Sequence, residues 1–183
     1  MRGGCVTTEL VRAVDHVVTA TGLNRSSLYA TFGGKQDLYL AALQRYVEQR
    51  SRLVLRRLAD DERGLPAISD FFTGLIETRC SGEYAGWGCM VSNAHAGAEN
   101  SAPEVRAILE GHHQELKRGM HAALSTAEAQ RQVATGTDLE AAAELLALLA
   151  YGVNLRSRAG AEPRTLKRTV AIALDSIGAI RAV

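Results

Sequence analysis

The sequence predicts an all-α protein, and three observations support this. Prolines are rare, with only three in 183 residues. Segments that alternate between polar and apolar residues, as half-buried strands do, are hard to find. Ala, Leu, Arg and Glu, which favour helices, dominate the composition. With 46% hydrophobic residues, the chain has enough apolar material to form a sizeable helical core.

The first expected helices surround a short turn. The pattern predicts a helix over 10–21, and Gly22 follows it at the position where a helix-ending glycine is favoured. Asn24 is suited to cap the next helix, which we expect to run to about Phe32. The glycine pair that follows then breaks this helix.

A long amphipathic helix is expected between Lys35 and about Ala59. Its apolar face is predicted to consist of Leu40, Leu43, Val47, Val54 and Leu58. The opposite face carries Arg45, Gln49, Arg52 and Arg56. Leu53 and Leu55 fall outside this stripe.

Later apolar repeats predict further helices over 66–79, 89–98, 103–124, 137–158 and 163–180. A charged linker, "DDERGLP", precedes the first of these, and the glycine-rich stretch "SGEYAGWGCM" separates the first two. The segment 137–158 is apolar around much of its circumference. A helix of that kind needs two packing partners, so one side is available for a second subunit.

Charge and cysteine content exclude several classes of protein. Lys and Arg total 21 against 20 Asp and Glu, so any nucleic-acid surface must be local. Residues 1–52 carry such a local excess, with seven basic and four acidic side chains. Cys5, Cys80 and Cys89 show neither paired nor metal-ligand spacing, so we expect no disulfide scaffold, no metal and no cofactor. No apolar run reaches the ~20 residues that span a bilayer, so we expect no membrane partner and a cytoplasmic location.

The segment from Gly22 to Lys35 has the pattern of a helix-turn-helix. In that motif the second helix packs its inward residues on the first and presents the others to the DNA major groove. Leu28 and Phe32, four residues apart, are expected to point inward. The remaining side chains suit phosphate oxygens and base edges, and the candidate DNA-binding residues are Asn24, Arg25, Ser26, Ser27, Tyr29, Ala30, Thr31 and Lys35. The spacing alone fits a short amphipathic helix of a bundle equally well.

The full string "TATGLNRSSLYATFGGKQDLYLAAL", Thr19 to Leu43, closely resembles the DNA-binding segment of the TetR family of bacterial transcriptional regulators. In that family one helix ends in Ala-x-Gly-(Val or Leu), a short recognition helix ends in Leu-Tyr-x-x-Phe, and a turn then leads to a Lys with an acidic residue and Leu soon after. The resemblance implies a small helix-turn-helix DNA-binding domain at 1–45 and a larger helical effector-binding and dimerisation domain at 46–183.

The resemblance also implies a mode of action. The expected protein is a homodimer, joined through its last two helices, that acts as a repressor on a palindromic double-stranded DNA operator. A small-molecule effector in each larger domain is expected to release it. Family members carry a full first helix before the motif, for which "MRGGCVTT" leaves too little room. We therefore expect a short or missing first helix and a DNA-binding domain of reduced stability.

Candidate effector-binding residues are aromatic or polar side chains that interrupt apolar stripes: Phe72, Trp87, Cys89, Asn93, His112, Tyr151 and Asn154. For His112, we favour the alternative interpretation of a buried and hydrogen-bonded core histidine. Tyr151 and Asn154 lie three residues apart and face either the pocket or the dimer partner. Some TetR-like regulators with a Gly-Cys at the position of Cys89 resemble sensors of electrophiles or oxidants, and a helix N-terminus favours a thiolate. The alternative is that Cys89 is simply a small buried hydrophobe.

Two other functions compete with this prediction. The first alternative is a helical dimeric module that has lost DNA binding. The second, which fits the residues less well, is an enzyme that uses Cys89 with a histidine. Phosphate-loop and zinc-protease patterns are absent, and no nucleophile, base and orienting group occur together. We therefore expect no catalytic residues and no enzyme activity.

Overall fold

A computed structural model describes residues 22, 24–82, 84–97 and 101–178, and these residues form an all-helical fold, as predicted. The elements are α2 (Arg25–Phe32), α3 (Lys35–Tyr46), the π-helical turn η1 (Val47–Ser51), α4 (Arg52–Ala59), α5 (Leu65–Cys80), α6 (Met90–Ala96), α7 (Pro103–Ala129), α8 (Leu139–Arg158) and α9 (Pro163–Ile177). The helix expected over 10–21 and the shortened first helix lie outside the described residues. The domain bounds 1–45 and 46–183 stay a prediction.

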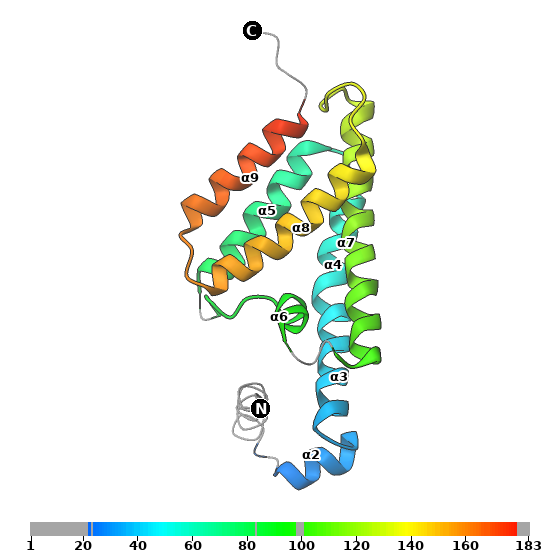
Figure 1. Cartoon of the computed structure of the whole chain (residues 1–183), viewed down its shortest axis with the longest axis vertical. Helices are drawn as coiled ribbons and strands as arrows, with labels where there is room; N and C mark the ends of the chain where they lie inside the picture. The colour runs from blue at the N-terminus through cyan, green and yellow to red at the C-terminus, as the bar shows by residue number, and fades with distance from the viewer. Residues whose placement is uncertain (1–21, 23, 83, 98–100, 179–183) are drawn as a thin grey trace.

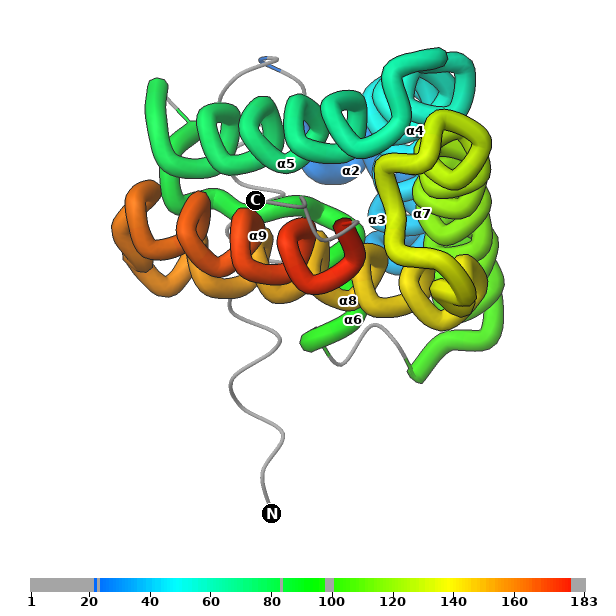
Figure 2. The backbone as a smooth tube through the Cα atoms, turned by 90° about the horizontal axis from the view of Figure 1, so that it is seen from above, coloured from blue at the N-terminus to red at the C-terminus, as the bar shows by residue number. Residues whose placement is uncertain are grey.

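The helices form two groups (Figure 1). α3, η1 and α4 run end to end as a long rod, which lies beside α7, with α2 at its lower end. α5 and α8 pack across the upper part of this pair, and α9 packs against α5 and α8 (Figure 2). The short α6 lies below α8, where it contacts α3, α7 and α8. In the described part of the chain, no helix is long and apolar enough to cross a membrane.

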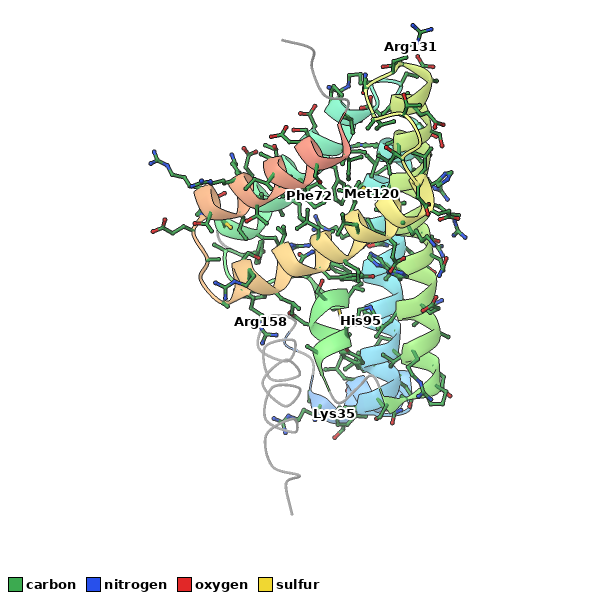
Figure 3. All side chains as sticks on the ribbon, turned by 45° about the horizontal axis from the view of Figure 1, so that its top comes forward. Lys35, Phe72, His95, Met120, Arg131 and Arg158 are labelled. Carbon is green, nitrogen blue, oxygen red and sulfur yellow. The ribbon has the colours of Figure 1, made fainter. Side chains whose placement is uncertain are left out.

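Two hydrophobic clusters hold the groups together. The upper cluster lies between α4, α5, α7, α8 and α9 and includes Phe72 and Met120, both fully buried (Figure 3). The lower cluster joins Leu43 and Val47 of the rod to residues of α6 and α7. The rod therefore contributes side chains to both clusters.

Local sequence signals explain where helices begin and how closely they pack. The side chain of Asn24 accepts a hydrogen bond from the Ser27 N–H at 2.7 Å and so caps α2, as predicted. Asp138 caps α8 in the same way, by accepting from the Ala141 N–H at 3.0 Å. At Gly119 of α7 an added Cβ would lie 3.3 Å from the carbonyl oxygen of Leu55, so this glycine allows α4 and α7 to approach closely.

The buried face of the rod differs from the prediction after Val47. The pattern placed Val54 in the core, but Val54 is 46% exposed and Leu55 is only 7% exposed. The physical reason is η1, because a π-helical turn takes up more residues than an α-helical turn and shifts the following side chains around the axis. The core residues below and above η1 therefore follow two registers.

This register gives a matched pair of substitutions. Leu55→Ala is expected to lower the free energy of unfolding by about 2–5 kcal/mol, because it leaves a cavity in the upper cluster. Val54→Ala removes an exposed side chain and is expected to change stability by less than about 0.5 kcal/mol. Urea unfolding of both variants checks this. A larger loss for Val54→Ala than for Leu55→Ala would show that the rod is an uninterrupted α-helix.

Candidate functional site

The candidate DNA-binding residues lie on and beside α2, at one end of the molecule (Figure 1). Gly33 ends α2 with a φ of 89°, which favours glycine, and its N–H donates to the Tyr29 carbonyl at 2.8 Å. Leu28 is buried, as expected for an inward residue. Phe32 was expected to point inward as well, but it is 40% exposed. The helix predicted over 10–21, on which it was expected to pack, lies outside the described residues.

The outer surface of α2 is polar. Asn24, Arg25, Ser26, Ser27, Ala30 and Thr31 are exposed, whereas Tyr29 and Lys35 are half-buried. Thr31 donates its hydroxyl to the Ser27 carbonyl at 2.9 Å, so this side chain bonds to its own helix. The first turn of α2 contains no acidic residue. Lys35 begins α3, at the same end of the molecule (Figure 3). A surface of hydroxyl, guanidinium and ammonium groups is suited to phosphate oxygens and base edges.

The effector candidates fall into four different environments. Phe72 is a fully buried member of the upper cluster, where it packs edge-on against Phe71. Trp87 is 65% exposed and pairs with Tyr84, at a ring-centroid distance of 5.3 Å. The structure therefore does not bring Trp87 together with the buried candidates. Asn93 lies near it and donates to the Trp87 carbonyl at 3.0 Å.

Cys89 and Asn154 belong to a chain of hydrogen bonds that links three helices and the segment before α6. The Tyr46 hydroxyl donates to Cys89 Sγ at 3.5 Å and accepts from Arg79 at 3.0 Å. Arg79 Nε also donates to Asn154 Oδ1 at 2.8 Å. Burial raises the pKa of Tyr46, so its hydroxyl remains protonated at neutral pH. We call Tyr46, Cys89, Arg79 and Asn154 the polar chain.

The sequence prediction missed Tyr46 and Arg79. A signal for both existed, because each occurs at helical spacing from buried apolar residues. Tyr46 follows Leu43 by three positions, and Arg79 follows Ile76 by three. A polar side chain that continues a core stripe is a candidate for a buried hydrogen-bond partner.

His112 and Tyr151 form a second polar group, next to Cys89. His112 Nδ1 lies 3.4 Å from the Tyr151 hydroxyl, and His113 stacks on the Tyr151 ring while its Nε2 contacts Glu144 at 3.2 Å. His95 of α6 packs edge-on against the same ring at 5.1 Å (Figure 3). Burial raises the pKa of Tyr151 and lowers the pKa of His112 to about 4, so both groups are neutral at neutral pH.

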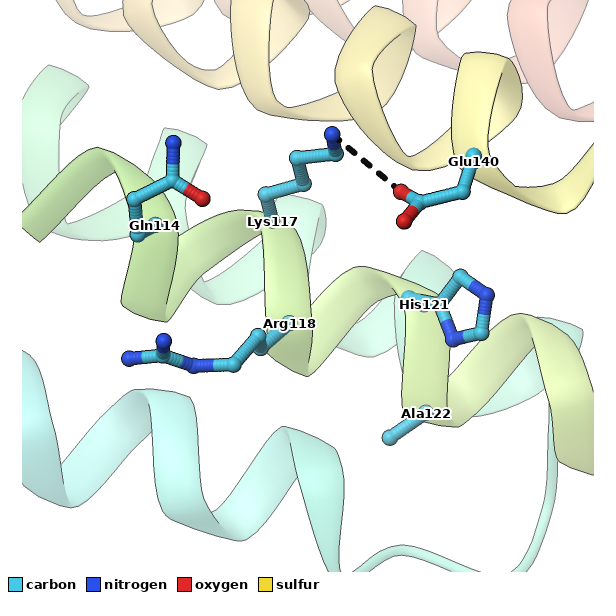
Figure 4. Close-up of a pocket in the computed structure, with 6 residues that line it drawn as sticks. All are labelled: Gln114, Lys117, Arg118, His121, Ala122 and Glu140. Atoms are coloured by element: carbon cyan, nitrogen blue, oxygen red, sulfur yellow. Dashed lines mark ion pairs between the residues drawn. The ribbon is translucent and has the colours of Figure 1, made fainter.

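A pocket of about 220 Å³ lies elsewhere, on the surface of α7 beside the start of α8 (Figure 4). It is lined by Gln114, Lys117, Arg118, His121, Ala122 and Glu140. Lys117 pairs with Glu140 at 3.2 Å. None of the effector candidates lines this pocket. Among the described residues, no three His, Cys, Asp or Glu side chains are arranged to hold a metal ion.

The environment of His112 makes stability depend on pH. The folded pKa is about 4, whereas the unfolded chain keeps the ordinary value of 6.5. Between these values only the unfolded chain binds the proton. The contribution of neutral His112 to the free energy of unfolding is therefore complete above pH 6.5 and is lost as the pH falls toward 4. This contribution is roughly 3 kcal/mol in total. Urea unfolding at pH 7 and pH 4.5 should show a smaller loss for His112→Gln than for the unchanged chain, and equal losses would contradict the assignment.

Comparison with known proteins supports the pattern found in the sequence. Residues 64–173 match the family model described as "Tetracyclin repressor-like, C-terminal domain". The transcriptional repressor ComR of Escherichia coli is 25% identical over 146 residues, which cover 79% of this chain and 69% of ComR.

Solved structures show the same fold. A cysteine mutant of the TetR-family regulator CifR, complexed with a 26-bp operator DNA, has a TM-score of 0.73 and 24% identity, with 87% of this chain and 83% of CifR covered. A TetR regulatory protein from Rhodobacter sphaeroides has a TM-score of 0.75 and 22% identity, with 94% and 98% covered. The family model covers more than half of the chain, and the chain therefore belongs to the TetR family of transcriptional regulators.

Proposed function

We propose that this regulator is a homodimeric repressor that binds a palindromic operator through α2 and is released by a small molecule bound in its larger domain. The observation that carries the DNA part is α2 itself. It is capped by Asn24, ended by Gly33 and polar on its exposed surface, with Arg25 and Lys35 at the same end of the molecule. ComR is named as a repressor, and CifR is solved on operator DNA, which agrees with this role. In this proposal the chain regulates transcription and catalyses no reaction. It acts in the cytoplasm, where the operator DNA lies.

The dimer proposal rests on apolar side chains that α8 and α9 leave exposed. Leu145, Leu148 and Leu155 recur at intervals of three and seven along α8 and are 42–55% exposed, and Ile172 of α9 is 61% exposed. Gly152 lies between Leu148 and Leu155 in sequence, and an added Cβ there would meet nothing within 4 Å. An apolar stripe with a small residue in it allows close approach of a second helix. A two-fold dimer would cover this surface and present two copies of α2 to two half-sites.

The effector proposal rests on the buried polar groups between α6, α7 and α8. We propose that Cys89, His112, Tyr151 and Asn154 contact the effector, because buried polar groups among apolar side chains give a ligand its orientation. The sensor role of Cys89 stays a prediction; the residue is only 6% exposed, and it precedes an α6 of seven residues. Release requires an effector that prefers a conformation in which the two copies of α2 no longer match their half-sites.

Selection of DNA tests the proposed function directly. The purified chain is mixed with a randomised duplex pool, and the retained sequences are read. Enrichment of a two-fold symmetric site is expected and supplies the operator. If no sequence is enriched, the proposed function is wrong, and the alternative of a helical module without DNA binding replaces it.

Substitutions on the DNA-binding surface separate base contacts from phosphate contacts. Arg25→Ala is expected to weaken operator binding by about tenfold to a hundredfold. Lys35→Ala is expected to reduce the slope of log affinity against log salt by about 2, because two copies each lose one phosphate contact. Fluorescence anisotropy at several salt concentrations measures both effects. Arg57→Ala, at an exposed arginine of α4, serves as the matched control and should bind like the unchanged chain.

A charge on the exposed stripe of α8 should separate the dimer. Leu148→Glu is expected to weaken dimerisation on the order of 10³-fold, since two copies each lose roughly 2 kcal/mol of apolar burial. Sedimentation equilibrium measures the change. Leu53→Glu places the same charge at a leucine of α4 that is 52% exposed, close to the 55% of Leu148. Equal effects of the two substitutions would show that the dimer uses another surface.

A further inference from the structure

Arg79 is a partly buried cation whose side chain has no anionic partner among the described residues. Its guanidinium donates to the amide oxygen of Asn154 and to the hydroxyl of Tyr46, both uncharged. No described carboxylate oxygen lies within 4 Å of it. Arg63 shows the contrast, because it is more exposed and yet pairs with Asp61 at 2.7 Å and Asp70 at 2.8 Å.

This arrangement leaves electrostatic free energy available to a ligand. A charge withdrawn from water is costly unless an opposite charge or several hydrogen bonds compensate for it. Asn154 and Tyr46 engage only part of the donor capacity of a guanidinium, which has five N–H groups in a planar fork that matches a carboxylate. Three residues after Cys89 in the sequence, Ser92 of α6 is 2% exposed, and its hydroxyl has no hydrogen-bond partner among the described residues.

We propose that Arg79 binds the carboxylate of an otherwise apolar small molecule, and that this acid is the effector. The proposal rests on the proposed function and names the chemical class of the ligand. An apolar body is proposed because the polar chain adjoins the lower cluster: Cys89 belongs to that cluster together with Val91 and Leu109, and Tyr46 packs against it. Ser92 supplies an unused hydroxyl for a second polar atom of the ligand.

The same hydrogen bonds connect the proposed carboxylate site at Arg79, which we call the acid site, to the rod. Tyr46 is the last residue of α3 and directly precedes η1, while Arg79 lies in the last turn of α5. The Arg79–Tyr46 bond of 3.0 Å therefore ties the part of the rod that leads to α2 to the body of the larger domain. A carboxylate bound in bidentate fashion to Arg79 uses Nη2, the nitrogen that also donates to the Tyr46 hydroxyl, and so competes with Tyr46 for that nitrogen. Loss of that bond frees the rod next to a π-helical turn, where helix geometry changes readily.

Direct binding tests the acid site without DNA. Isothermal titration calorimetry on the full chain compares benzoate, octanoate and indole-3-acetate, each with its neutral amide. At least one acid is expected to bind about tenfold to a hundredfold more tightly than its amide, because a bidentate pair with Arg79 forms only with the acid. Arg79→Met should abolish this preference, and Arg79→Lys should keep part of it. Arg57→Met is the matched control and should keep it in full.

Three results would overturn the proposal: no acid of the panel binds, acids and amides bind equally, or Arg79→Met retains the preference. Far-UV circular dichroism tests whether each variant is folded. If Arg79→Met does not fold, a reduced acid preference in Arg79→Lys is the result that tests the proposal.

Operator binding tests the connection to the rod. Tyr46→Phe should bind the acid at least as tightly as the unchanged chain, because no hydroxyl competes, but the acid should weaken its operator binding less. An unchanged response would refute the connection. Acid binding without any selected operator would refute the proposed function and leave the acid site standing. A selected operator without acid binding would refute the acid site and leave the proposed function standing.

Discussion

The packing of the α3–η1–α4 rod against α7 is the constraint on which the rest of the structure depends. Leu43 and Val47 of the rod belong to the lower cluster, and Leu55 and Leu58 belong to the upper one. α7 likewise contributes to both clusters. Because protein interiors are close-packed, the rod cannot shift along α7 without disturbing one cluster or the other. A discrete change of packing is the natural way for α2, at the end of this rod, to respond to events in the larger domain.

The helices could be predicted because their signals are local. Apolar spacing, the cap at Asn24, the glycine pair after Phe32 and the proline at the start of α9 each act within a few residues. The buried face of α4 could not be predicted in the same way. Periodicity assumes one register along the whole helix, and η1 changes the register within it, so that Leu55 replaces Val54 in the core.

The candidate site was predicted less completely, for a different reason. Cys89 and Asn154 stood out as polar residues in apolar surroundings, and they do belong to one chain of hydrogen bonds. The two residues between them, Tyr46 and Arg79, come from helices far apart in the sequence, and only the tertiary packing brings them together. Trp87 was predicted to line a pocket because its side chain is aromatic. Its position on a glycine-rich loop instead leaves it exposed.

Acidic side chains of α7 and α8 are paired with groups other than Arg79, which agrees with a preference of Arg79 for an external anion. Glu115 pairs with Arg52 at 3.0 Å, and Glu144 lies 3.2 Å from His113 and 4.0 Å from Lys117. Glu110 accepts a hydrogen bond from Gln114 at 2.8 Å. These carboxylates are thus occupied along α7 and α8, and His112 adds no positive charge at neutral pH because burial lowers its pKa to about 4. In the polar chain itself, Tyr46 and Asn154 are uncharged, so the described side chains that accept hydrogen bonds from Arg79 do not balance its positive charge.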